Sequence, residues 1–424
     1  AEGATAETLR LLLELGASVD ARPDGRPAAW FACGGMGWNH PPGGDASRVA
    51  VLLEARADIR WTPHTWGDGP GQALLAHAVE TGDPDRVELL LAAGADPDPV
   101  GIENSYEWPL HDAVESGSVP VVALLLDAGA DVNRPLVGFS DPLLGMSSSV
   151  DMVALLLRHG ADLEPPRESP RQRRDEDYDK AHVLTEIAGT QEATASERVE
   201  MLRLVVEFLN VPTALVDLAL SCAVFAHEPD AVQSLLEAGA DPYGRPHLLS
   251  QVCFGARLAP DPSIDRVIDL LIDAGLDPND EDDQGFRPLH TALSPDTFGP
   301  DYQESDGFNA PAALALLRHG AEADVVFPTT PIAAIDGDVM SGLTALHAAA
   351  LIGAGAGDVV EALLHAGADP TLLTPDGRTA LDLARTALAE FTADWEPANV
   401  ADLAIAWRHR QAAEEQREYE FLLT

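Results

Sequence analysis

Residues 30–40, WFACGGMGWNH, combine a thiol, an imidazole and three glycines in one short stretch. A thiol beside an imidazole can act as a nucleophile, and closely spaced glycines can expose backbone amides to a phosphate. However, His40 lies seven residues beyond Cys33, past a break of glycines, so no pattern ties the two residues together. A phosphate-binding loop also needs a strand before it and a helix directly after it, and neither is expected here. We therefore predict that Cys33 is not catalytic.

A second group of side chains could bind a positively charged ligand. Two neighbouring segments end in the similar sequences LLAHAVETG and PLHDAVESG. Aligned on their final glycines, they place His77 opposite Asp112 and Glu80 opposite Glu115. One imidazole and three carboxylates could hold a divalent cation, a guanidinium or an ammonium group, or nothing. Helices that pack about 10 Å apart leave too much room for an unaided tight metal site, so we predict no resident metal or other cofactor.

The composition narrows the classes of partner. The chain has 424 residues, 46% of them hydrophobic, and a net charge of −44 from 70 acidic and 26 basic side chains. Such a surface repels nucleic acid and anionic membranes and favours basic partners, although the charge could also serve solubility alone. The three cysteines form no CxxC pair, and no apolar run reaches about 18 residues. We expect a cytoplasmic protein that does not bind membranes or nucleic acid directly; the oligomeric state stays open.

One phrase returns throughout the chain, as in LLLELGASVD, LLLAAGADPD, LLLDAGADVN and LLHAGADP. Each copy is the end of an amphipathic helix, closed by a glycine that can adopt the left-handed conformation. A unit of about 33 residues with insertions fits this spacing. We predict that such helices end near positions 16, 56, 94, 129, 160, 210, 239, 275, 320 and 367.

A second signature precedes several of these helices: WPLHDAVESG, RPLHTAL, LTALHAAALIG and DGRTALDLA. The two signatures recur in the same order, and together they resemble the ankyrin repeat. The resemblance implies about ten repeats with insertions, in an acidic protein of bacterial type. It also implies an all-α solenoid of helix–turn–helix units joined by finger hairpins or loops, whose inner helices and fingers form a concave surface.

The strength of the two signatures varies along the chain and predicts four regions. Residues 1–164 carry N-terminal ankyrin repeats, and residues 165–213 carry a degenerate repeat with a charged insertion. Residues 214–389 carry the C-terminal repeats, and residues 390–424 predict a helical cap.

The ankyrin resemblance implies structural positions for Trp30 and Cys33. It puts Trp30 at the histidine position of the inner helix and Cys33 at a small position between repeats, so we expect a buried, unreactive thiol. The glycine-rich stretch after Cys33 becomes an insertion between two helices. At the histidine position itself, the resemblance implies structural hydrogen bonds for His111, His290 and His347.

Aromatic residues accompany the acidic ones in the N-terminal repeats. Trp61, Trp66 and Tyr106 fall in predicted fingers, where they either wedge between fingers or await a partner. Phe31 shares its repeat position with His77 and Asp112. The candidate binding residues are therefore Phe31, Trp61, Trp66, His77, Glu80, Tyr106, Asp112 and Glu115.

These features predict a non-enzymatic scaffold that binds a basic protein or peptide on its concave face. One alternative is an antitoxin, immunity protein or nucleic-acid mimic that acts through its negative surface. Another is an enzyme that modifies a peptide at His77, Asp112, Glu80 and Glu115. Repeat arrays spread binding over many side chains, and no catalytic set of residues stands out, which favours the scaffold.

Overall fold

The structure is a computed structural model that describes residues 5–20, 27–33, 45–58, 74–98, 108–134, 142–164, 176–245, 247–253, 261–294, 308–328, 341–352 and 356–389. These residues are predominantly helical and joined by turns, and Val326 and Thr344 form an isolated antiparallel bridge. The all-α prediction is therefore confirmed. None of the helices in these ranges is long and apolar enough to cross a membrane.

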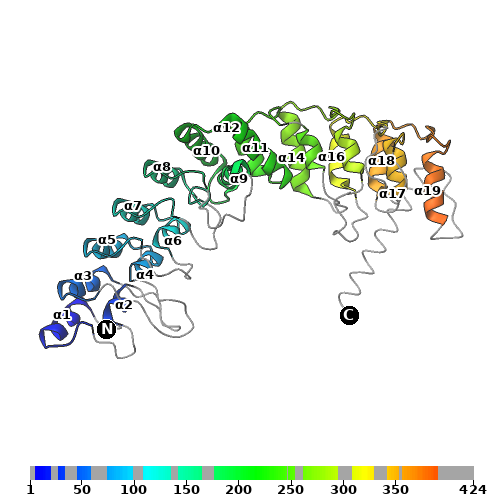
Figure 1. Cartoon of the computed structure of the whole chain (residues 1–424). Coiled ribbons are helices and arrows are strands. Elements are labelled where there is room, and N and C mark those ends of the chain that lie inside the picture. The colour runs from blue at the N-terminus through cyan, green and yellow to red at the C-terminus, as the bar shows by residue number, and fades with distance from the viewer. Residues whose placement is uncertain are drawn as a thin grey trace, which may run out of the picture. The chain divides into compact units, whose positions relative to one another are not determined.

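Helices of two kinds alternate along most of the chain (Figure 1). Outer helices carry the recurring leucine-rich phrase: α1 (Ala6–Glu14), α3 (Ala46–Glu54), α5 (Pro84–Ala92), α7 (Val119–Asp127), α8 (Val150–Arg158), α10 (Ala195–Leu209), α12 (Pro229–Ala238), α14 (Pro262–Asp273), α16 (Ala310–Arg318) and α18 (Gly357–His365). Inner helices precede or follow them: α2 (Ala28–Ala32), α4 (Leu74–Glu80), α6 (Pro109–Glu115), α9 (Glu176–Gly189), α11 (Thr213–Phe225), α13 (Leu248–Val252), α15 (Pro288–Leu293), α17 (Ala345–Ile352) and α19 (Ala380–Ala389).

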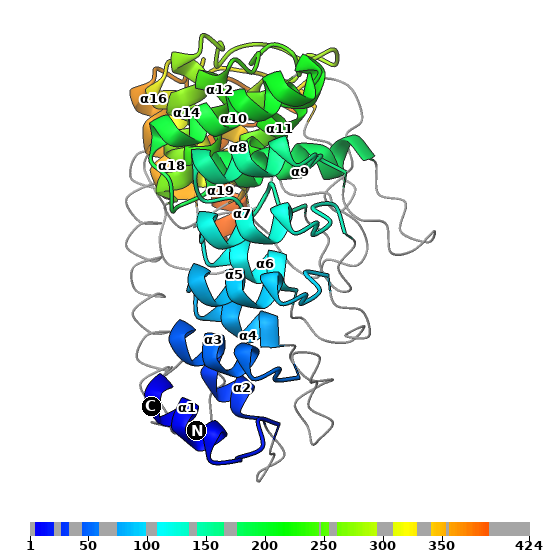
Figure 2. The same ribbon diagram turned by 90° about the vertical axis from the view of Figure 1, so that its left-hand side faces the viewer.

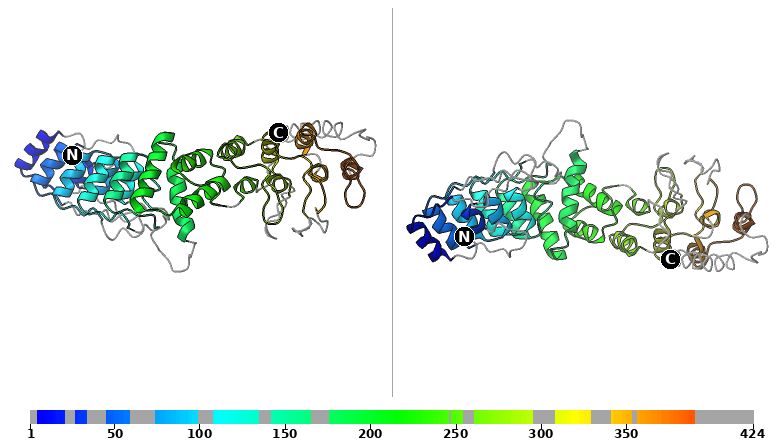
Figure 3. Two further views of the ribbon diagram at one scale, coloured as in Figure 1. Left: turned by 90° about the horizontal axis from the view of Figure 1, so that it is seen from above. Right: turned by 90° about the horizontal axis from the view of Figure 1, so that it is seen from below.

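The chain divides into two compact units, 1–216 and 217–424. In the N-terminal unit, outer helices α1, α3, α5 and α7 pack side by side, and inner helices α2, α4 and α6 form a second layer against them (Figure 2). In the C-terminal unit, α12, α14, α16 and α18 pack in sequence, as do α13, α15, α17 and α19 (green to orange in Figure 3). Each unit is thus a stack of repeats.

The start of an outer helix is marked by a side chain that accepts a hydrogen bond from the first turn. Asp45, Asp83 and Asp261 each accept from the backbone N–H two residues later, at 2.9–3.1 Å. Thr194 and Glu197 form a reciprocal capping box at α10. Because the first amides of a helix lack partners within the helix, these side chains fix where α3, α5, α10 and α14 begin, whereas α7, α12 and α18 have no such side-chain cap.

The ends of the outer helices follow the sequence prediction. A left-handed residue stands at every predicted end: Gly16, Arg56, Gly94, Gly129, Gly160, Asn210, Gly239, Gly275, Gly320 and Gly367. Arg56 and Asn210 adopt the conformation without being glycine, with φ of 60° and 50°. The repeat geometry therefore imposes this backbone even on Arg56, whose side chain disfavours it, whereas asparagine tolerates it.

The core lies between the two helix layers and consists mainly of small and aliphatic side chains, with a few aromatic ones such as Trp30 and Phe308. Ala113 and Val114 of α6, and Val122 and Leu125 of α7, are fully buried. One repeat departs from the pattern, because residues 142–147 before α8 form turns instead of an inner helix. In the C-terminal unit, residues 325–327 pair in antiparallel fashion with residues 342–345, and the Phe327 N–H donates to the Leu343 carbonyl at 2.8 Å.

Candidate binding surface

The inner helices α2, α4 and α6 present the described candidate residues. The α2–α4 and α4–α6 pairs pack directly against each other, so equivalent positions lie on consecutive helices. Phe31 is half-buried on α2. Its ring meets the ring of Trp30 edge-on, with the two ring centroids 5.0 Å apart. Trp30 is buried and meets the His77 ring edge-on at 5.1 Å. The aromatic side chains of α2 thus support the imidazole of α4.

On α4, an imidazole and a carboxylate form a pair. The Nδ1 atom of His77 lies 3.0 Å from Oε2 of Glu80, one helical turn later. His77 is 7% exposed, whereas Glu80 is exposed. The buried ring therefore holds an exposed carboxylate in a defined position.

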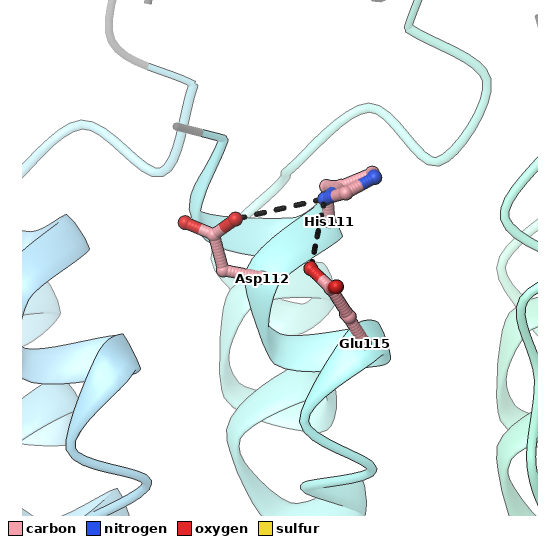
Figure 4. Close-up of side chains that lie close together, drawn as sticks. All are labelled: His111, Asp112 and Glu115. Atoms are coloured by element: carbon pink, nitrogen blue, oxygen red, sulfur yellow. Dashed lines mark ion pairs between the residues drawn. The ribbon is translucent and has the colours of Figure 1, made fainter. Parts of the chain in front are cut away.

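On α6, three side chains converge on one another (Figure 4). The Nδ1 atom of His111 lies 3.6 Å from Oδ1 of Asp112 and 4.0 Å from Oε2 of Glu115. His111 is buried, Asp112 is half-buried and Glu115 is exposed. The three-residue group on α6 runs from the core to the surface of the helix, and we call it the α6 cluster.

Electrostatic effects link the two helices. Burial raises the pKa of Asp112 above its usual range, and the neighbouring His111 opposes this shift. The carboxylates of Glu80 and Glu115 raise the pKa of Asp112 further, because like charges nearby disfavour its ionised form. Glu80 on α4 therefore belongs to the same electrostatic environment as the α6 cluster.

The structure adds one residue to the predicted group. The prediction grouped His77, Glu80, Asp112 and Glu115, and gave His111 a structural role. The structure also places His111 close to Asp112 and Glu115, while His77 pairs with Glu80. The spacing i, i+1, i+4 within HDAVE was the available signal, since residues four apart lie on one face of a helix. Trp61, Trp66 and Tyr106 lie outside the described residues.

The other two histidines at this repeat position have the expected structural role. The Nδ1 atom of His290 accepts a hydrogen bond from the backbone N–H of Arg287 at 2.9 Å. His347 accepts from the backbone N–H of Thr344 at 3.2 Å. In both cases the donor lies three residues before the histidine, so the bond satisfies a backbone N–H group at the start of an inner helix.

Cys33 is fully buried, as predicted. Burial raises the pKa of its thiol to about 12, and the nearby Arg86 opposes the shift only in part. Arg86 is itself buried and donates to the Cys33 carbonyl at 3.3 Å, so this position joins two repeats. A protonated thiol without access to solvent is a poor nucleophile.

The aromatic ring of Trp108 has a partner within the protein. The guanidinium of Arg134 lies 3.6 Å from the ring centroid, and its Nη1 atom lies 3.5 Å from Oδ1 of Asp98. A stacked arginine of this kind contributes to stability through a cation–π contact. Trp30 is part of the core, so neither of these two tryptophans offers an open aromatic face to a ligand.

Comparisons with known proteins agree with this architecture. A family model for ankyrin repeats in three copies matches residues 42–135, and a single-repeat ankyrin model matches residues 341–375. No curated protein sequence matches the chain significantly.

Two solved structures show limited likeness. The human ASB11 ankyrin repeat domain is 20% identical, with a TM-score of 0.38 over 62% of this chain and 100% of that one. The ankyrin repeat domain of Bcl-3, of the IkappaB protein family, is 28% identical, with a TM-score of 0.32 over 47% of this chain and 77% of that one. Neither TM-score is high enough to add to the assignment, which rests on the sequence matches and on the stacked helix pairs. Because both sequence matches fall on such pairs and the same design recurs between them, the chain is an ankyrin-repeat protein.

Proposed function

We propose that this protein-interaction scaffold binds a basic segment of a partner protein on inner helices α2, α4 and α6. The observation that supports the proposal is the grouping of Glu80, Asp112 and Glu115: burial raises the pKa of Asp112, and the charges of Glu80 and Glu115 raise it further. An arginine or lysine from a partner relieves this repulsion and donates charge-assisted hydrogen bonds to the carboxylates. The half-buried ring of Phe31 supplies apolar contact beside the acidic group.

The net charge of −44 is spread over the whole chain, so weak attraction of any cation is expected everywhere. A specific site must therefore be distinguished from this general field. Partly buried carboxylates hold a guanidinium more strongly than exposed ones, because water and salt screen them less. Asp112 is half-buried, which favours the α4–α6 surface over the exposed acids of the outer helices. Trp61, Trp66 and Tyr106 extend the proposed surface as sequence predictions.

The experiment measures binding of a fluorescein-labelled peptide of alternating arginine and glycine by fluorescence anisotropy. The site variant is Glu80→Gln with Glu115→Gln. The matched control is Glu14→Gln with Glu88→Gln, which removes the same charge from exposed positions on α1 and α5. We expect the site variant to weaken binding by about tenfold and the control by less than about twofold, given about 1.4 kcal/mol per tenfold change.

Equal losses in both variants would contradict the proposal and favour a diffuse acidic surface, as in a nucleic-acid mimic. Raising the salt concentration separates the two cases again. A diffuse surface loses its affinity steeply with salt, whereas contacts that include Phe31 and the half-buried carboxylate retain part of it.

A further inference from the structure

Backbone hydrogen bonds define equivalent positions on the inner helices of both units. The carbonyls of Ala113 on α6, Ala223 on α11 and Ala292 on α15 each accept a hydrogen bond from the backbone N–H of the residue that caps the next outer helix, at 2.9–3.1 Å. Residues at the same distance from this alanine therefore hold the same place in their repeats. Asp112 precedes Ala113 by one residue and Glu115 follows it by two, which fixes the two acidic positions of α6.

Two exposed apolar side chains in the C-terminal unit stand where α6 has Glu115. Phe225 follows Ala223 by two residues and is 64% exposed. Leu351 on α17 follows His347 by four residues, the spacing that separates Glu115 from the α6 histidine, and is 46% exposed. The position that carries carboxylates in one unit therefore carries apolar groups in the other.

Charged side chains are rare on this row of inner helices. Within the described residues, α11, α13, α15 and α17 contain one Asp, Glu, Lys or Arg, namely Asp217, although 23% of the whole chain is charged. Asp217 is buried and therefore does not face a ligand. Burial lowers the pKa of His290 and His347, so both imidazoles are neutral at pH 7.

These four helices form one continuous row. The Ser221 hydroxyl donates to Oε1 of Gln251 at 2.7 Å, which joins α11 to α13, and the α13–α15 and α15–α17 pairs pack directly against each other. With helix axes about 8–10 Å apart, the row spans roughly 24–30 Å, the length of about nine residues of extended chain. We call five of its half-buried or exposed side chains the neutral face: Cys222, Phe225, Gln251, Thr291 and Leu351.

The charges around the neutral face determine which ligand it can hold. These five side chains offer a basic segment no carboxylate, and burying an unpaired charge against apolar groups is costly. Burial raises the pKa of the Cys222 thiol, and the nearby positive charge of Arg245 opposes that shift; the same charge repels a basic ligand. A second copy of the chain is disfavoured because each copy carries a net charge of −44. An uncharged segment meets neither penalty.

We propose that the neutral face binds an extended, uncharged segment of a partner protein that has an apolar side chain at every second residue. Alternate side chains of an extended chain point to the same side, so such a segment turns its apolar groups together toward Phe225 and Leu351. The two units then take ligands of different character: a basic segment on α2, α4 and α6, and an apolar one on α11, α13, α15 and α17. The neutral face does not depend on the acidic surface, so either proposal can fail alone.

The probe is a fluorescein-labelled peptide of about nine residues that alternates leucine with serine and carries lysines at its ends for solubility. Its control peptide has serine in place of every leucine. The site variant is Phe225→Ser with Leu351→Ser. The matched control is Phe208→Ser with Leu11→Ser, which removes the same kinds of side chain from α10 and α1, where they are 59% and 55% exposed. We expect the site variant to weaken binding of the leucine peptide by about tenfold and the control by less than about twofold, with unchanged circular dichroism in both.

Thiol labelling locates the bound peptide. Cys222 is half-buried, whereas Cys33 and Cys253 are buried, so N-ethylmaleimide reaches Cys222 first. A saturating amount of the leucine peptide should slow the labelling of Cys222 severalfold, whereas the serine peptide should leave its rate unchanged. Mass spectrometry of the digested protein measures the three rates separately.

The Glu80→Gln, Glu115→Gln variant separates the two surfaces, because it should retain binding of the leucine peptide. The proposal is overturned if the leucine peptide binds no better than the serine peptide, if site and control variants lose equal affinity, or if the peptide leaves the labelling of Cys222 unchanged. It is also overturned if light scattering shows a dimeric wild type and a monomeric site variant, since a second copy then covers the neutral face. Failure of the arginine–glycine peptide to bind would instead contradict the proposed function alone.

Discussion

The Oδ1 atom of Asp324 accepts a hydrogen bond from the backbone N–H of Asp369 at 2.8 Å, across the boundary between two repeats. The acceptor lies four residues after the left-handed end of its outer helix, and the donor lies two residues after the end of the next one. The same relation joins Asp20 to Asp58 at 2.8 Å, Asp98 to Asp131 at 2.7 Å, Asn133 to Asp162 at 3.2 Å and Asn279 to Glu322 at 2.8 Å. The fingers are thus joined by a recurring bond from side chain to backbone.

An asparagine at the acceptor position makes an additional bond. The Nδ2 atom of Asn133 donates to the Gly160 carbonyl at 2.8 Å, and that of Asn279 donates to the Gly320 carbonyl at 3.2 Å. An aspartate cannot donate in this way. Positions occupied by aspartate therefore make one bond fewer to the next repeat than positions occupied by asparagine.

We expect Asp324→Asn to raise the free energy of unfolding by about 1 kcal/mol, because the new amide can donate to the Gly367 carbonyl. Asp324→Ala should lower it by about the same amount, because the Asp369 N–H loses its acceptor. Urea denaturation followed by circular dichroism measures both. The charge-matched control is Asp283→Asn, at an exposed position in a turn. Equal stabilisation by Asp324→Asn and Asp283→Asn would show that charge, and not the bond, is responsible.

Arg56 provides a test of the helix-end geometry. Its φ of 60° lies in the left-handed region, which costs a residue with a Cβ atom about 1–2 kcal/mol. Arg56→Gly should therefore raise the free energy of unfolding by about 1 kcal/mol, after allowance for the greater freedom of glycine in the unfolded chain. Asn210→Gly should give a smaller gain, since asparagine tolerates this conformation. Arg56→Ala separates the backbone effect from loss of the side chain: a gain as large as that of Arg56→Gly would contradict the argument.

The sequence predicted the helix ends because they are local. A leucine-rich helix followed by a left-handed residue and an Asx turn is encoded within about ten residues, so even Arg56 and Asn210 could be placed by register. The burial of Cys33 followed from its repeat position in the same way.

Side-chain partners from other repeats were harder to predict. The stacking of Arg134 on Trp108 depends on how a finger returns to an inner helix, and no local pattern encodes it. The closeness of His111 to Asp112 and Glu115 was missed because the prediction considered only its structural role at this repeat position. The candidate site was therefore predicted at the level of helices and positions, but not of contacts.

In the repeat that starts with α11, a buried carboxylate on the helix itself takes the place of the finger residue that accepts the hydrogen bond from the next repeat. Asp217 is 6% exposed, and its Oδ1 atom accepts from the backbone N–H of Asp241 at 2.8 Å. In other repeats a finger residue supplies this acceptor; here the inner helix does. Gly244 lies directly against the Asp217 carboxylate. A Cβ atom at position 244 would clash with that carboxylate and lie 3.1 Å from the Asp241 carbonyl oxygen.

Gly244→Ala should therefore lower the free energy of unfolding by about 1–3 kcal/mol, as overpacking does in other tightly packed sites. A double-mutant cycle with Asp217→Ala tests the cause. The smaller side chain at position 217 removes the clash, so Gly244→Ala should cost much less in that background than in wild type. Additive losses would show that the Asp217 carboxylate is not what Gly244 accommodates.

We expect the buried imidazole of His290 to make the free energy of unfolding of the C-terminal unit depend on pH. Its ring lies between Phe286 and Phe327, with centroid distances of 5.8 and 4.7 Å, and it is buried. Burial lowers the pKa of His290 to about 4, and the adjacent charge of Arg287 lowers it further. In the unfolded chain the group returns to about 6.5, so between these values the unfolded state binds the proton more readily.

The stability contributed by neutral His290 is present above about pH 6.5 and is lost as the pH falls toward 4. From pH 7 to pH 5 this one group should lower the free energy of unfolding by about 2 kcal/mol, at 1.36 kcal/mol per pH unit below 6.5. Urea denaturation at both pH values measures the change. His290→Gln keeps an acceptor for the Arg287 N–H and should lose about 2 kcal/mol less than wild type over this range. His365→Gln, on the exposed end of α18, is the control and should follow wild type. Parallel pH curves for wild type and His290→Gln would show that the acid sensitivity of this unit arises elsewhere.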